Sequence, residues 1–179
     1  DLNGSLIFTG GGEFNVFSST AAYWGFGDSA HLEMDGGTLS YNNAIRITDD
    51  FTSNISGGTI KTVGYFWNES DNFLPTGGTV EMVGVSDGYI RTDFGHFHNL
   101  KINKAEVRTA GFQPTTKNRR LSREGSREEV TRNNAITMNN DLVIKGDFTL
   151  SSGTFHTGTY DMYVSGDWTN NVGEAAFFE

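Results

Sequence analysis

The sequence predicts an all-β protein, a parallel β-helix (β-solenoid) with about 20 residues in each coil. Gly, Ser, Thr and Asn supply 73 of the 179 residues, whereas Asp, Glu, Lys and Arg supply 20%. A helical bundle is instead rich in Ala, Leu, Glu and Lys. Aromatic residues make up 13% of the chain, more than a disordered tract contains. Short motifs also recur about every 20 residues, as they do in solenoids.

Two motifs carry this period. The first is a Gly-Thr pair followed by an apolar residue, found at 36–39, 57–60, 77–80 and 152–155. The second joins an acidic residue to an aromatic residue and Thr, at 47–52, 144–149 and 164–169. Gly, Asn and Asp flank short alternating segments such as 100–102, so each coil should hold short strands separated by turns.

The second motif predicts which residues stack on one another. We expect Phe51, Phe148 and Trp168 at equivalent positions of successive coils, and the Asp that precedes each of them at one corner. These carboxylates either cap turn amides or hold a stack of calcium ions. The chain contains no Gly-Gly-x-Gly-x-Asp nonapeptide, and we predict neither a metal nor any other cofactor.

One segment departs from the pattern. Residues 115–134 hold six of the 13 basic residues and three of the 22 acidic ones, so this segment carries +3 and the rest of the chain −12. We predict a single domain, 1–179, with an inserted loop at 112–135. The segment is either a solvated loop or a basic strap that contacts the acidic body or a neighbouring subunit. Its arginines are Arg119, Arg120, Arg123, Arg127 and Arg132.

Composition excludes several classes of function. The chain has no cysteine, which rules out disulfides, thiolate zinc sites and thiol nucleophiles. A net charge of −9 argues against nucleic-acid partners and anionic membranes. No apolar run is long enough to insert into a membrane. The chain opens at Asp1 without a signal-type segment, and we expect a processed protein or an excised fragment.

Catalytic patterns are weak. Asp49 and Asp50 are adjacent, so on a strand they point to opposite faces and make a poor acid–base pair. His96 and His98 share a face on a strand and have a spacing that suits a metal, but no third ligand is near them in the sequence. No Gly-x-Ser-x-Gly motif occurs. We therefore predict that the chain is not an enzyme.

The repeats resemble those of large β-helical surface proteins of Bacteroidetes-type bacteria, many of them exported by type IX secretion. The similarity rests on residues 76–82, 97–104, 139–154 and 164–171, which are degenerate repeats and not a catalytic motif. It implies a right-handed parallel β-helix, an extracellular or cell-surface location and an adhesive or structural role. Asp28-Ser29-Ala30 resembles the O-glycosylation sequon of such proteins, which implies a glycan on Ser29.

The leading functional hypothesis is a non-catalytic structural protein. A solenoid has two open ends, and apolar residues lie near both ends of this sequence: Leu6, Ile7, Phe8, Phe177 and Phe178. The chain is then a stalk segment of a larger protein or a subunit that polymerises head to tail. The alternative is a carbohydrate-binding adhesin module, with surface glycans as partners and an aromatic platform drawn from Tyr23, Trp24, Tyr65, Trp67 and Tyr89. A polysaccharide lyase or hydrolase is the third hypothesis.

Overall fold

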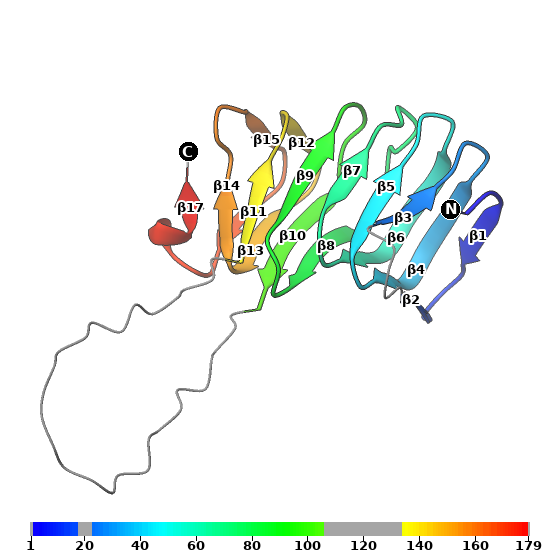
Figure 1. Cartoon of the computed structure of the whole chain (residues 1–179), viewed down its shortest axis with the longest axis horizontal. Coiled ribbons are helices and arrows are strands. Elements are labelled where there is room, and N and C mark those ends of the chain that lie inside the picture. Colours follow the sequence, from blue (N-terminus) through cyan, green and yellow to red (C-terminus); the bar gives the residue numbers. More distant parts are fainter. Residues whose placement is uncertain (1, 18–22, 106–133, 179) are drawn as a thin grey trace, which may run out of the picture.

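The chain folds into a β-solenoid. The computed structural model describes residues 2–17, 23–105 and 134–178. Within this part, one 3-10 helix, η1 (Glu174–Ala176), is the only helical element, and all neighbouring strands are parallel. The first and last strands lie at opposite ends of the stack (Figure 1). The predicted fold class is therefore confirmed.

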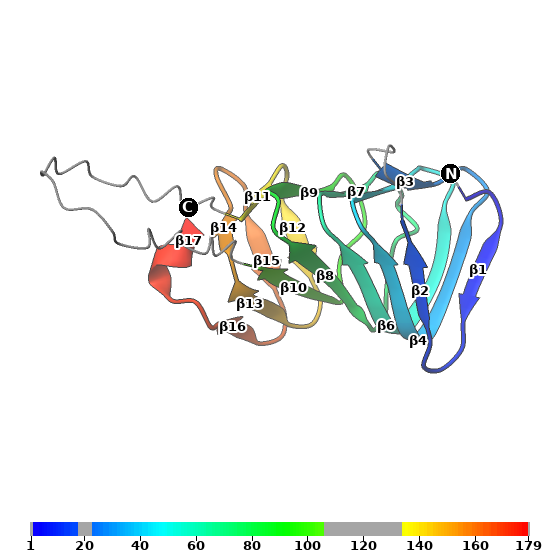
Figure 2. The ribbon, with the colours of Figure 1, turned by 60° about the horizontal axis from the view of Figure 1, so that its bottom comes forward.

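Two large sheets form the walls of the solenoid, which Figure 2 shows from a second direction. One has eight strands in the order β1 (Ser5–Phe8), β4 (His31–Tyr41), β6 (Thr52–Thr62), β8 (Thr79–Gly84), β10 (Asn99–Lys104), β13 (Phe148–Ser152) and β16 (Trp168–Asn170), with β2 (Glu13–Val16) also beside β4. The other has seven, in the order β3 (Tyr23–Phe26), β5 (Ala44–Ile47), β7 (Phe66–Asn68), β9 (Gly88–Thr92), β11 (Ala135–Met138), β14 (Thr154–His156) and β17 (Phe177–Phe178). A short third sheet pairs β12 (Leu142–Ile144) with β15 (Met162–Val164).

The core consists of rungs of apolar side chains that run along the solenoid axis. One rung, which we call the Leu39 rung, can be followed through five strand pairings in the eight-stranded sheet. It contains Leu39, Ile60, Val80, Leu100, Phe148 and Trp168. All of these except Trp168 are buried. Burying such rungs between coils is what stabilises a fold in which each coil contacts only its neighbours.

The Gly-Gly-Thr motif forms one corner of the stack. Gly37, Gly58 and Gly78 have φ angles of 72°, 81° and 77°, a conformation that glycine adopts without strain. A Cβ atom on Gly58 would also lie 2.5 Å from the carbonyl oxygen of Gly36 in the preceding coil. Close backbone approach and positive φ together explain why this motif recurs with the coil period.

The acidic corner residues cap backbone amides. The Asp167 N–H donates to Asp147 Oδ1 at 2.9 Å, and the Asp147 N–H donates to Asn99 Oδ1 at 2.9 Å. A second ladder has the same form, since the Asp161 N–H donates to Asp141 Oδ1 at 2.9 Å. Each of these side chains accepts a hydrogen bond from the next coil, so the first of the two interpretations of these carboxylates describes their contacts.

The predicted stacking of aromatic residues is correct for one pair and wrong for Phe51. Phe148 and Trp168 are register partners, with ring centroids 4.6 Å apart. Phe51 precedes β6 and packs on Phe26 at 5.1 Å, while Ile60 occupies the Leu39 rung in that coil. The motif around Phe51 therefore occurs at a different corner of the coil, which its sequence similarity did not reveal.

Most of the predicted insertion, including its five arginines, lies outside the described residues. Its two ends meet, because the Asn134 side-chain amide donates to the carbonyl oxygen of Ala105. Ala135, the last residue of the predicted insertion, is instead the first residue of β11. Thr92 and Asn140 are hydrogen-bonded partners 48 positions apart, the 28 residues 106–133 added to the spacing of 20 seen elsewhere.

Candidate functional site

The outer face of the seven-stranded sheet carries a row of stacked side chains, which we call the arginine–aromatic ladder. Arg46, Trp67 and Arg91 are register partners on β5, β7 and β9. The guanidinium carbons of Arg46 and Arg91 lie 4.6 Å and 4.9 Å from the Trp67 ring centroid. Tyr65 and Tyr89 lie beside them and stack at 4.7 Å with 6° between their planes. Since β7 lies between β5 and β9, the two guanidinium groups approach Trp67 from opposite sides.

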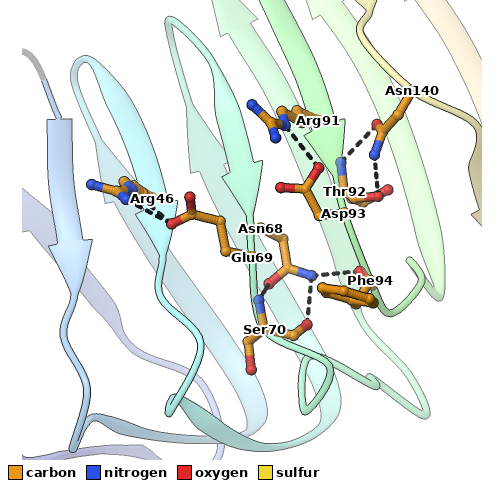
Figure 3. A network of polar contacts seen from close by, with 9 residues as sticks. All are labelled: Arg46, Asn68, Glu69, Ser70, Arg91, Thr92, Asp93, Phe94 and Asn140. Carbon is orange, nitrogen blue, oxygen red and sulfur yellow. Dashed lines mark hydrogen bonds and ion pairs between the residues drawn. The ribbon is translucent and has the colours of Figure 1, made fainter.

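Carboxylates on the same face hold the two arginines (Figure 3). Arg46 Nη2 lies 2.8 Å from Glu69 Oε2, and Arg91 Nε lies 2.8 Å from Asp93 Oδ1. Burial raises the pKa of Tyr65 and of Tyr89, so both phenols are neutral at physiological pH. The ladder therefore pairs its two cations with two anions and has little net charge to attract an ionic ligand.

A polar corner lies beside the ladder (Figure 3). The Asn68 side-chain amide donates to the carbonyl oxygens of Phe94 at 2.7 Å and Ser70 at 3.0 Å. One coil further, the Thr92 N–H donates to Asn140 Oδ1 at 2.9 Å. Asn68, Ser70 and Thr92 are buried, so their hydrogen bonds join successive coils and none is directed to a ligand.

The ladder leaves little ring surface for a sugar. An aromatic platform binds a sugar through an open ring face. Here, guanidinium groups cover Trp67, and Tyr65 and Tyr89 cover each other. Trp24 does not belong to this face, because it packs toward the core against Phe26, with centroids 4.7 Å apart.

A second polar cluster lies on the outer face of the eight-stranded sheet. Glu81 has its carboxylate oxygens 3.0 Å from Lys101 Nζ and 3.6 Å from Lys61 Nζ, and accepts a hydrogen bond from Asn103 at 2.8 Å. Burial alone raises the pKa of Glu81, but these hydrogen bonds and positive charges outweigh it and lower the pKa below its usual value. The cluster spans adjacent strands and stabilises their pairing.

The C-terminal end of the solenoid is open. Trp168 belongs to the buried Leu39 rung, yet 44% of its surface is exposed. Phe177 packs on Trp168 with centroids 4.9 Å apart, and Phe178 stacks on His156 at 4.7 Å. These residues line a cavity of about 480 Å³ together with Asn170 and Glu174. The predicted contact residues Phe177 and Phe178 therefore lie at a surface where a core position ends.

The N-terminal end is open in the same way. Leu6 and Phe8 of β1 pack against the core, whereas Ile7 points outward and is 56% exposed. Phe14 of β2 is the register partner of Leu39 and is 44% exposed. The sequence prediction named Leu6, Ile7 and Phe8 but missed Phe14, and it named Phe177 and Phe178 but gave Trp168 only a stacking role. The repeat offsets hold the signal for both omissions.

The remaining candidate residues are not brought together. His96 Nε2 lies 3.2 Å from the carbonyl oxygen of Pro75, and burial lowers its pKa. Ser29 is exposed in a turn. Among the described residues, no three His, Cys, Asp or Glu side chains form a metal-binding group, and no helix is long and apolar enough to cross a bilayer.

Searches against protein families, curated proteins and solved structures gave no match to this chain.

Proposed function

We propose that the chain is a non-catalytic structural segment of an extracellular or cell-surface protein, acting as part of a stalk or as a subunit that joins others end to end. The observation that carries this proposal is the end of the Leu39 rung. Every residue of the rung from Leu39 to Phe148 is covered by the next coil, but Trp168 is not. A further coil on this surface would bury it as the others are buried, which supplies the driving force for stacking.

The other two hypotheses have less support. Carbohydrate binding needs open aromatic faces, and the arginine–aromatic ladder uses its own. A lyase or hydrolase needs a pair of carboxylates at a catalytic separation. Glu69 and Asp93 are the carboxylates of the most polar outer face, and both are paired with arginines.

An added coil tests the proposal. A second copy of residues 157–178 placed directly after Phe178 would continue the register, because Phe178 pairs with His156. The copy should carry Phe in place of its Trp, so that any change in fluorescence reports on the native Trp168. We expect Trp168 to become shielded from acrylamide and the melting temperature to rise by roughly 2–4 °C for each kcal/mol gained.

The control is a coil of the same composition in scrambled order. The proposal is wrong if the scrambled coil stabilises the chain as well as the ordered one, or if the ordered coil leaves Trp168 as accessible as before.

A further inference from the structure

The two ends of the solenoid present matching sets of strands. The first coil contributes β1, β2 and β3, and the last contributes β15, β16 and β17, in the same order along the chain. The Leu39 rung connects β2 to β16, because Phe14 pairs with Leu39 at one end and Phe148 with Trp168 at the other. A coil placed beyond β16 in the same register would therefore put a residue like Phe14 on Trp168.

The other two strands match in the same way. The line that begins at Phe8 on β1 reaches Val164 on β15, by strand pairing, an isolated bridge and the backbone hydrogen bonds of Thr76 and His96; it passes Met34, Ile55, Phe97 and Ile144. The line that begins at Tyr23 on β3 reaches Phe178 on β17, passing Ala44, Tyr65, Tyr89, Thr137 and His156. All three strands of one end thus have a counterpart at the other.

Hydrogen-bond acceptors at the C-terminal end fit this arrangement. Asp147 and Asp141 accept the N–H groups of Asp167 and Asp161 in the next coil. Asp167 and Asp161 occupy the same positions one coil further on. In a following coil that begins with β1 and β2, the amides at the matching positions are those of Glu13 and Ser5, which directly precede Phe14 and Leu6.

We propose that the C-terminal end of one copy binds the N-terminal end of a second copy, in the register that pairs β15 with β1, β16 with β2 and β17 with β3. This inference rests on the proposed structural function and specifies its partner. The interface is heterologous, because different surfaces of the two copies meet, and it repeats with every added copy. The product is an open filament whose strands continue from one copy to the next.

Charge makes this association depend on salt. The N-terminal end carries Glu13, and the C-terminal end carries Asp161, Asp167 and Glu174, while residues 1–30 and 157–179 contain no Lys or Arg. The two ends therefore repel each other, and salt screens that repulsion. Assembly should strengthen as the NaCl concentration rises, the opposite of the behaviour expected from a basic strap that bridges acidic bodies.

Cysteine pairs test the register, because the chain has no cysteine of its own. Asn15→Cys with Thr169→Cys places thiols on outward positions of β2 and β16 next to the proposed Phe14–Trp168 contact, and Ile7→Cys with Tyr163→Cys does so on β1 and β15. All four native residues are exposed. The mismatched control combines Ile7→Cys with Thr169→Cys. Each pair lies at opposite ends of one chain, so a disulfide between its two positions must join different copies.

We expect both matched pairs to form ladders of dimers, trimers and longer species on oxidation in high salt, at least tenfold more than the mismatched pair. Negative-stain images of the unmodified chain should show filaments of uniform width. Equal cross-linking of the mismatched pair, or a monomer at every salt concentration in sedimentation, would overturn the inference. If the chain is monomeric but the added coil of the previous test still shields Trp168, the self-association is wrong and the structural function stands.

Discussion

Lys104 shows how much a single residue contributes at the corner between β10 and β11. Its side chain is buried, and its Nζ donates to the carbonyl oxygen of Val83 at 2.7 Å and to that of Val63 one coil further back. Three successive coils are therefore joined by one ammonium group. Burial lowers the pKa of Lys104 to about 8, because the charged form loses its hydration.

This buried amine predicts that stability rises with pH. The folded chain releases the Lys104 proton near pH 8, whereas an unfolded lysine holds its proton up to about pH 10.4. In that interval the unfolded state binds more protons, so raising the pH favours folding. We expect the free energy of unfolding in urea to increase by about 2 kcal/mol between about pH 7.5 and 9.5. Lys104→Met should abolish the increase, and an identical pH profile in this variant would refute the assignment.

At the scale of elements, the Gly-Gly-Thr corner predicts a sharp difference between two glycines. Gly58→Ala forces a side chain into positive φ and against the Gly36 carbonyl, and should cost about 2–3 kcal/mol in chemical denaturation. Gly11 is the matched control, since no atom lies within 4 Å of the position its Cβ would take. Gly11→Ala should change stability by less than about 0.5 kcal/mol. Equal losses in the two variants would contradict this account of the corner.

The elements also show what sequence patterns can and cannot predict. Alternation along a strand correctly places Tyr65 and Trp67 on one side of the sheet. Alternation does not say whether Tyr23 or Trp24 faces outward, since that choice depends on the register with Ala44 and Ile45. The arginine–aromatic ladder was also beyond sequence reasoning, because Arg46, Trp67 and Arg91 share no motif and meet only through strand pairing.

For the whole molecule, the period near 20 residues was enough to predict the fold, because each coil repeats the same set of turns and rungs. The same period reveals how the insertion is accommodated. Removing residues 106–133 and joining Ala105 to Asn134 leaves 20 positions between the partners Thr92 and Asn140. We expect this deletion variant to fold with a melting temperature within a few degrees of the parent chain, as measured by circular dichroism.

A longer deletion provides the control for that experiment. Removing 106–136 also takes away the start of β11, including the buried Ile136, and shifts the register of all later strands. This variant should lose several kcal/mol of stability. If the shorter deletion is as damaging as the longer one, then the 28 residues contribute to the fold and are not a simple insertion.

The meeting of Ala105 and Asn134 has a consequence for the dimensions of the molecule. Its length along the axis grows by about 4.8 Å for each coil, and a segment that leaves and re-enters at one corner adds chain without adding length. The corner between β10 and β11 is therefore a mounting point. A folded domain whose two termini lie as close together as Ala105 and Asn134 can be carried there as cargo, at a fixed height on the solenoid and without disturbing the rungs on either side.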